Sequence, residues 1–152
     1  MSSFICLDSS VLIKLLVLEE DSDKADALME KILEKRQSVV LPGFAWAEVG
    51  SVLRKKVNKK MITPDQAEIA WEAFNNLGIL NYLNDSVVIR AAWHIAVKEK
   101  LPTLYDTTYL AVAEIISRQS NEVCQFWTAD ETLIRSIKDK NYVYSLKTFG
   151  GI

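Results

Sequence analysis

The chain has few of the residues that build several common kinds of site. It contains one histidine, His94, and two cysteines, Cys6 and Cys124, among 152 residues. Because the cysteines lie in apolar segments without CxxC spacing, we expect buried free thiols rather than a disulfide or a zinc site. The neighbours of His94 place it mid-helix at or near the surface. A Ser-His-Asp triad has little support, since no GxSxG elbow is present.

Long apolar runs and an excess of basic residues are also missing. The longest apolar run, 11–18, is interrupted by Lys14 and is too short to cross a bilayer. The first residues lack the basic start and apolar stretch of a signal peptide, so we expect a cytoplasmic protein with no membrane contact. The net charge is −2, whereas domains that bind nucleic acid by bulk electrostatics are usually basic. Any nucleic-acid contact is therefore expected to be local or helped by bound cations.

The overall composition is that of a globular domain. Hydrophobic residues make up 49% of the chain and charged residues 25%, which is ordinary usage. No repeat, low-complexity tract or Gly/Ser linker divides the sequence. We therefore expect one domain over residues 1–152, large enough to bury a core.

Short apolar runs alternate with amphipathic segments along the chain. The runs predict strands over 4–7, 39–41, 79–83, 123–128 and 142–144, and those over 4–7 and 123–128 are expected to be buried. Helical spacing and capping residues predict helices over 11–18, 22–36, 44–57, 64–77, 86–98, 105–118 and 131–137. Thr63 and Gln66 form a capping-box pattern, and Gly78 is expected in the left-handed conformation after that helix. The alternation predicts an α/β fold with a central, mostly parallel sheet covered on both faces.

Two acids follow buried strands directly. Asp8 comes after the first strand, and Asp130 follows Thr128 with only Ala129 between them. A single aspartate at such a position is commonly a helix cap or a turn residue. In parallel sheets, however, ligands bind beyond the carboxyl ends of the strands. Two acids at two strand ends are therefore expected in one crevice.

Two further acids lie on predicted helices. Glu48 falls on or beside the apolar face that contains Val49 and Val52, where a carboxylate needs a cation or hydrogen bonds unless its head reaches water. Asp106 lies in the first turn of its helix, where the amide dipoles favour an anion, so a structural role alone would also explain it.

Taken together, the four acids would repel one another if they converged. No lysine, arginine or histidine lies in the same short motifs to compensate them. A divalent cation would remove that repulsion, and oxygen ligands favour Mg²⁺ or Mn²⁺ over zinc. Such a site suits phosphoryl chemistry, in which a metal activates water and neutralises charge on the phosphate.

These residues resemble the PIN-domain family, and within it the VapC-type toxins of toxin–antitoxin pairs. The segments that carry the resemblance are 5–13, 46–49, 105–113 and 126–130. It implies a three-layer α/β/α fold and a Mg²⁺- or Mn²⁺-dependent endoribonuclease that cleaves RNA phosphodiesters by in-line attack of metal-activated water. Asp8, Glu48, Asp106 and Asp130 take the family's acidic, metal-holding positions, and Ser9, Ser10 and Thr128 match its small hydroxyl residues near the metal. The resemblance also implies a homodimer and a small antitoxin partner whose C-terminal segment covers the acidic groove.

Several alternatives stay open at this point. The chain could be a PIN-like binding module without turnover, or a PIN nuclease of RNA processing rather than a toxin. A receiver-like or phosphatase-like domain ranks last, because Asp8 has no second acid beside it. The single dense basic run is either solvated surface or a contact for RNA phosphates; it comprises Arg54, Lys55, Lys56, Lys59 and Lys60.

The four tryptophans are expected to serve packing rather than base stacking. They stand at positions 46, 71, 93 and 127. Trp71, Phe74 and Leu77 share one helical face, which is expected to pack within the chain and could instead pack in a dimer.

Overall fold

A parallel sheet runs through the middle of the molecule. The structure is a computed structural model that describes residues 2–137 and 140–150. In the described part, the sheet has five strands in the order β3-β2-β1-β4-β5, all parallel. The strands are β1 (Phe4–Leu7), β2 (Ser38–Pro42), β3 (Leu80–Leu83), β4 (Gln125–Thr128) and β5 (Val143–Ser145).

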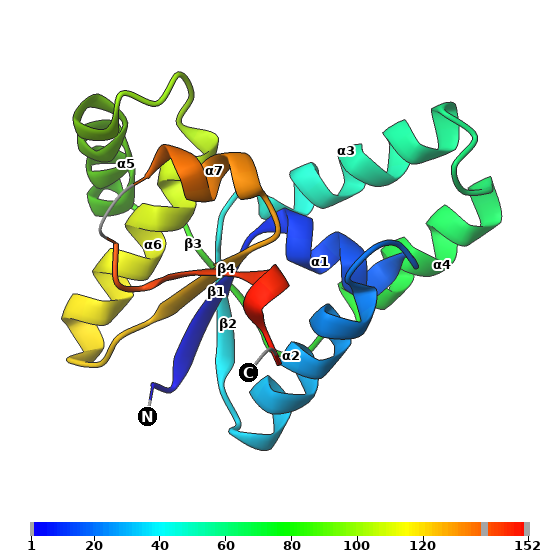
Figure 1. Ribbon diagram of the computed structural model, residues 1–152, viewed down its shortest axis with the longest axis horizontal. Helices are drawn as coiled ribbons and strands as arrows, with labels where there is room; N and C mark the ends of the chain where they lie inside the picture. The colour runs from blue at the N-terminus through cyan, green and yellow to red at the C-terminus, as the bar shows by residue number, and fades with distance from the viewer. Residues whose placement is uncertain (1, 138–139, 151–152) are drawn as a thin grey trace.

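Helices cover both faces of this sheet, as Figure 1 shows. They are α1 (Ser9–Leu16), α2 (Ser22–Glu34), α3 (Ala45–Asn58), α4 (Pro64–Asn75), α5 (Ser86–Glu99), α6 (Tyr105–Ser120) and α7 (Glu131–Ser136), with a 3₁₀ turn η1 (Leu146–Thr148). Helices α5 and α6 lie on one side, and α1 and α2 on the other (Figure 1). The predicted three-layer α/β/α fold with a parallel sheet is confirmed.

The core is continuous across the sheet and fixes how the helices sit on it. Leu7 and Phe126 of the strands and Val11 and Leu12 of α1 are fully buried. Helix α6 has seven buried residues among its 16, because it packs between the sheet and α5. Helix α1, which follows β1 directly, and helix α6, on the other face of the sheet, therefore have little freedom to shift.

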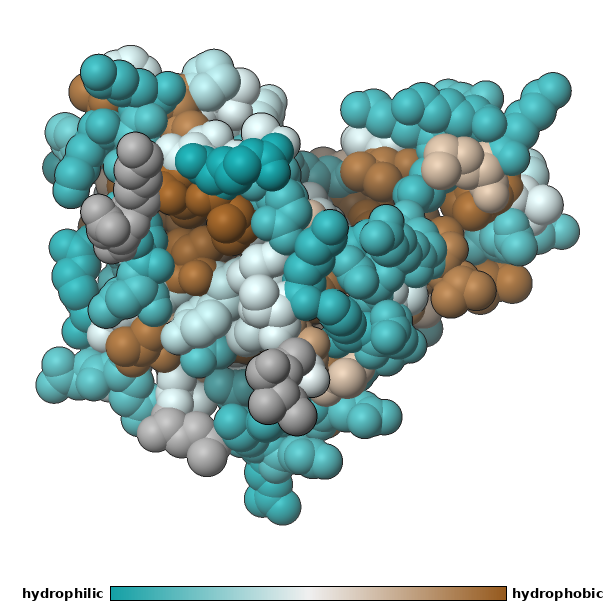
Figure 2. Space-filling model, viewed as in Figure 1, coloured by the Kyte–Doolittle hydropathy of each residue, from teal (hydrophilic) through white to brown (hydrophobic). Residues whose placement is uncertain are grey.

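Helices α3 and α4 form a hairpin that projects beyond the sheet (Figure 1). The two helices pack on each other, and Trp71 stacks on Phe74 with ring centroids 5.7 Å apart. Phe74 is buried, so the face of Trp71 and Phe74 packs within the chain, as expected. Figure 2 shows hydrophobic residues gathered on this hairpin.

The ends of some elements differ from the sequence prediction. Gly78 does not have the predicted left-handed conformation, since Gly150 is the one glycine with positive φ among the described residues. The reason is that α4 ends earlier, at Asn75, and the N–H of the next residue, Asn76, bonds to the carbonyl oxygens of Glu72 and Ala73. That tightened last turn satisfies the carbonyls without a left-handed residue.

Two further predictions, buried thiols and no membrane-spanning helix, can be compared with the described part of the chain. Cys6 and Cys124 are both buried free thiols. Within residues 2–137 and 140–150, no helix has the length and apolar character needed to span a bilayer.

The cap at the start of α4 gives a direct test of local stability. Gln66 N donates to Thr63 Oγ1 at 3.1 Å, and Thr63 N donates to Gln66 Oε1 at 2.8 Å. Thr63 is exposed, so its contribution to stability comes from this cap rather than from packing. Thr63→Ala should lower the free energy of unfolding by about 1 kcal/mol in urea denaturation, whereas Thr63→Ser should retain most of it. Equal losses in both variants would contradict the capping assignment.

Candidate active site

Asp8 is a buried carboxylate at the carboxyl end of the central strand. Its N–H continues the sheet ladder to Trp127 O at 2.9 Å, and the residue is 5% exposed. The Asp8 Oδ2 atom accepts hydrogen bonds from Ser10 Oγ at 2.8 Å and from Thr128 Oγ1 at 2.7 Å. Although Asp8 occupies the cap position of α1, its side chain makes no capping bond. The carboxylate is therefore held for something other than capping the helix.

The two hydroxyl groups that hold Asp8 are themselves oriented by the backbone. Ala129 N donates to Ser10 Oγ at 3.0 Å, and Asp130 N donates to Thr128 Oγ1 at 3.0 Å. Since each hydroxyl has one hydrogen, accepting an amide N–H leaves that hydrogen to point at Asp8. Both bonds end on Oδ2, so the Oδ1 atom takes part in neither.

Burial and neighbouring charge act on the Asp8 carboxyl in opposition to these bonds. Burial raises the pKa of Asp8, the hydrogen bonds from Thr128 and Ser10 lower it, and the charge of Asp130 raises it again. The net direction is upward from the ordinary value. The charged form of Asp8 is therefore costly unless a positive charge comes close.

Glu48 lies in the first turn of α3 and is held by a tyrosine. Tyr109 Oη donates to Glu48 Oε1 at 2.7 Å from the opposite helix α6, and Tyr109 is buried. Burial raises the pKa of Glu48; the Tyr109 bond lowers it, and the charges of Asp8 and Asp106 raise it. The sequence indicated that this carboxylate needs a cation or hydrogen bonds, and one such bond is present. It placed Tyr109 only in the apolar stripe, although a buried tyrosine hydroxyl itself calls for a partner.

Asp106 and Asp130 occupy the starts of two helices. Asp106 lies half-buried in the first turn of α6, and burial together with the charges of Asp8 and Asp130 raises its pKa to about 6. Asp130 caps α7, because its Oδ1 accepts from Thr132 N at 3.0 Å and from Leu133 N at 3.1 Å. The capping interpretation of Asp130 is thus correct for one of its oxygens, which leaves Oδ2 outside the cap.

These side chains line one cavity of about 330 Å³, which we call the acidic cavity. Its lining comprises Asp8, Ser9, Ser10, Ile13, Lys14, Glu19, Glu48, Val52, Lys56, Asp106, Ala129 and Asp130. The structure thus brings the four predicted acids to one place, together with Ser9 and Ser10. Thr128 joins them through its bond to Asp8.

The donor atoms of the acidic cavity suit a hard divalent cation. The acids supply only oxygen donors, and their charges raise one another's pKa. In the described part of the chain, however, no three acidic, cysteine or histidine side chains lie close enough to hold one ion. The acids therefore share a cavity without forming a coordination shell, and their role as metal ligands stays a prediction.

The basic run on α3 is divided by the structure. Lys56 is part of the acidic cavity, where its Nζ lies 2.8 Å from Glu19 Oε2. Arg54 and Lys55 line a second cavity of about 680 Å³ between α3 and α4, which also contains Trp46 and Trp71. Lys59 and Lys60 are exposed at the end of the helix. RNA binding by the five residues of this run stays a prediction.

Three residues of the site were not singled out from the sequence. They are Tyr109 and the pair Lys14 and Glu19, which line the acidic cavity beside Lys56. Periodicity gives no signal for the pair, since Glu19 lies in the loop after α1. His94 is exposed, as expected. Trp127 is buried and stacks on Tyr144, whereas Trp46 and Trp93 are 53% and 59% exposed and do not serve core packing.

Comparisons with known proteins agree with this fold. A family model described as the PIN domain matches residues 5–136. The solved structure of PAE2754 from Pyrobaculum aerophilum is 20% identical, with a TM-score of 0.61 over 96% of this chain and 86% of that one. VapC20 of Mycobacterium tuberculosis, described as a sarcin–ricin loop cleaving toxin, is 15% identical, with a TM-score of 0.58 over 89% and 98%. A search of curated proteins found no match.

Removing the charge of Asp106 is expected to stabilise the metal-free protein at neutral pH. Its folded pKa of about 6 lies above the ordinary 3.8, so Asp106 favours folding below about pH 4 and loses that contribution as the pH rises through 6. Asp106→Asn should therefore raise the free energy of unfolding at pH 8, by about 1 kcal/mol once solvent screening at a half-buried site is allowed for. At pH 4 the variant should match the wild type.

The measurement is urea denaturation at both pH values in the presence of a chelator. Glu68→Gln, which neutralises an exposed acid of α4, is the matched control and should change little. A less stable Asp106→Asn protein at pH 8 would show that the site carries no electrostatic strain.

Proposed function

The chain belongs to the PIN-domain family of nucleases, and we propose that it is a Mg²⁺- or Mn²⁺-dependent endoribonuclease. The observation that carries this proposal is the acidic cavity, where acids from four separate elements meet at the carboxyl edge of a parallel sheet. Like charges placed around the buried Asp8 carboxylate destabilise the folded protein, so stability alone does not explain why these residues are together.

In the proposed site, Asp8, Glu48, Asp106 and Asp130 would hold the cation. When bound, the ion would lower the pKa of a water molecule and neutralise charge on the RNA phosphodiester. The remaining residues fix the ligands, because a ligand that can rotate loses both affinity and geometry. Ser10 and Thr128 hold Oδ2 of Asp8, as described above, and Tyr109 holds Oε1 of Glu48.

We further propose that the protein is a toxin with a cognate antitoxin. Support comes from the fold shared with VapC20, which is described as a toxin. The second cavity, between α3 and α4, adds exposed apolar surface of the kind that partner proteins cover, with Trp46 53% exposed at its rim. A PIN nuclease of RNA processing, or a binding module without turnover, is the alternative.

Cleavage of RNA by the purified protein tests the nuclease proposal. A single-stranded RNA should be cut in Mg²⁺ or Mn²⁺ and left intact when the metal is chelated. Asp8→Asn should lower the rate by at least about 100-fold, because the variant removes one negative ligand at the most buried position. Its thermal unfolding should remain cooperative, since the amide can still accept from the two hydroxyls.

Controls separate this proposal from its alternatives. Glu68→Gln should cleave like the wild type. If RNA is bound but never cut with either metal, the chain is a binding module. Arrest of bacterial growth on expression of the wild type, but not of Asp8→Asn, would distinguish a toxin from a processing nuclease.

We also propose that two copies associate through α5. Ile89, Trp93 and Val97 recur every four residues on this helix, and each is more than half exposed. A stripe of this kind suits a symmetric contact with its own copy.

Trp93→Glu should disrupt that contact by placing a charge in the middle of the stripe. Light scattering after size exclusion should show a dimer for the wild type and a monomer for the variant. Trp46→Glu alters a tryptophan on α3 that is 53% exposed, against 59% for Trp93, and should stay dimeric. A monomeric wild type at tens of micromolar would refute the proposed dimer.

A further inference from the structure

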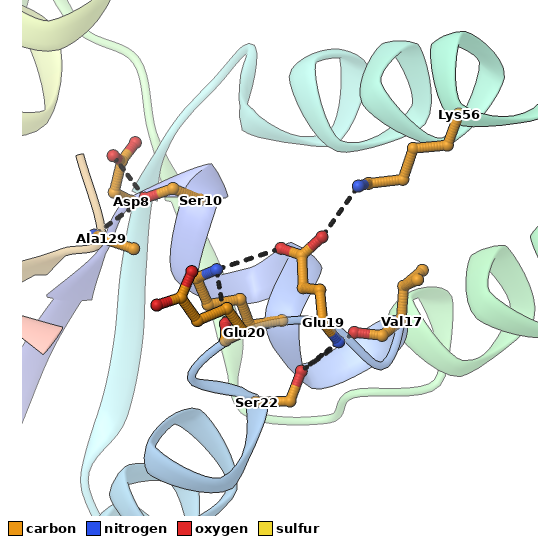
Figure 3. A network of polar contacts seen from close by, with 9 residues as sticks. Asp8, Ser10, Val17, Glu19, Glu20, Ser22, Lys56 and Ala129 are labelled. Atoms are coloured by element: carbon orange, nitrogen blue, oxygen red, sulfur yellow. Dashed lines mark hydrogen bonds and ion pairs between the residues drawn. The ribbon is translucent and has the colours of Figure 1, made fainter. Parts of the chain in front are cut away.

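Beside the four acids, the acidic cavity contains a network of two lysines and one glutamate. Glu19 Oε1 accepts from Lys14 Nζ at 3.2 Å, and Glu19 Oε2 accepts from Lys56 Nζ at 2.8 Å. Lys14 Nζ also donates to Glu20 O at 2.7 Å. Figure 3 shows the Glu19 carboxylate between α3 and the loop, directed at Lys56. Both oxygens of this one carboxylate are therefore in use.

The network lies on the same helix faces as the acids. On α3, Glu48, Val52 and Lys56 follow at spacings of four and all line the cavity, so Lys56 stands two turns, about 12 Å, beyond Glu48. On α1, Lys14 stands one turn beyond Ser10, which bonds to Asp8. The cavity thus has an acidic end at the strand tips and a basic end between α1 and α3.

The charges at the basic end do not balance. Two ammonium groups face one carboxylate, and the lysine side chains are only 15% and 13% exposed. Desolvating a second lysine costs free energy that one shared acid does not recover. Stability alone therefore does not account for two lysines here.

The two lysines pair with Glu19 rather than with any of the four acids. The described residues form three ion pairs, two of them at Glu19 and the third between Lys140 and Glu114. None involves Asp8, Glu48, Asp106 or Asp130. Although burial acts to raise the pKa of Glu19, the bonds from Lys56 and Lys14 bring it below the ordinary value. Glu19 therefore stays ionised and continues to hold both ammonium groups.

We propose that Lys14 and Lys56 form a phosphate subsite that binds the RNA backbone next to the phosphate being cleaved. This inference rests on the proposed nuclease function. It predicts that the bound RNA runs from the acidic end of the cavity toward the basic end. An RNA strand carries a phosphate at every nucleotide, so a phosphate held at the acids brings its neighbour along the groove. The excess positive charge of the network would meet that neighbour. Glu19 acts as a positioning residue.

Salt dependence of RNA binding tests the subsite. In the Asp8→Asn background, which prevents cleavage, the affinity for a fluorescent single-stranded RNA is measured in Mg²⁺ from 50 to 300 mM salt. Adding Lys56→Met or Lys14→Met should each reduce the slope of log K against log salt by about 0.7, the value for one phosphate contact on a single strand. Lys56→Arg should restore the slope. Lys31→Met, an exposed lysine of α2, removes the same charge elsewhere and should leave it unchanged.

Turnover in the otherwise wild-type protein gives a second readout. Lys56→Met should raise KM about 5- to 10-fold while kcat changes less than about 3-fold, because the contact is made equally in the bound and transition states. If Lys56→Met only lowers Tm, with slope and KM unchanged, the network is structural and the subsite is refuted while the nuclease remains. If the wild-type protein neither binds nor cuts RNA, the proposed function and the subsite both fail.

Discussion

The position of one buried carboxylate, Asp8, sets the geometry of everything around it. Asp8 ends the central strand, and its Oδ2 is held by hydroxyls from α1 and β4. Those hydroxyls are in turn oriented by amides of the turn between β4 and α7. The arrangement depends on the register of β1 against β4, with Cys6 opposite Phe126 and Leu7 opposite Trp127. A shift of one residue would turn Thr128 to the other face of the sheet and leave Asp8 without half of its support.

The acids of the cavity repel one another, and the fold leaves this repulsion uncompensated. Burial and mutual repulsion raise the pKa of Asp8, Glu48 and Asp106, which a structure selected only for stability would avoid. The nearby lysines could relieve this repulsion, but they pair with Glu19 instead. The cavity therefore keeps two separated charges, negative at the strand ends and positive between α1 and α3. That separation suits the proposed function, in which a strand of phosphates crosses a cation site.

The sheet, its carboxyl edge and the helix caps could be predicted from the sequence, because each depends on residues that are close together in the chain. Apolar runs followed by Asp8 and Asp130 locate the sheet edge, because parallel strands end at one edge. The capping box at Thr63 is likewise local. By contrast, the bond from Tyr109 to Glu48 joins residues 61 apart, and the pairing of Glu19 with Lys56 joins residues 37 apart. Neither has a periodic signature. Gly78 was wrongly assigned because glycine can, but need not, take a left-handed conformation.

The spread of the site along the chain has a consequence for its synthesis. Thr128, which completes the support of Asp8, leaves the ribosome 120 residues after it, and Asp130 follows. Strand β1 pairs with β2 on one side and with β4 on the other, so the central strand lacks its second neighbour until β4, which begins at residue 125, has been made. Because chains begin to fold from the N-terminus during translation, partial chains contain most of the helices but no complete cavity. A site built this way is completed in one late step, when β4 and the turn after it join β1.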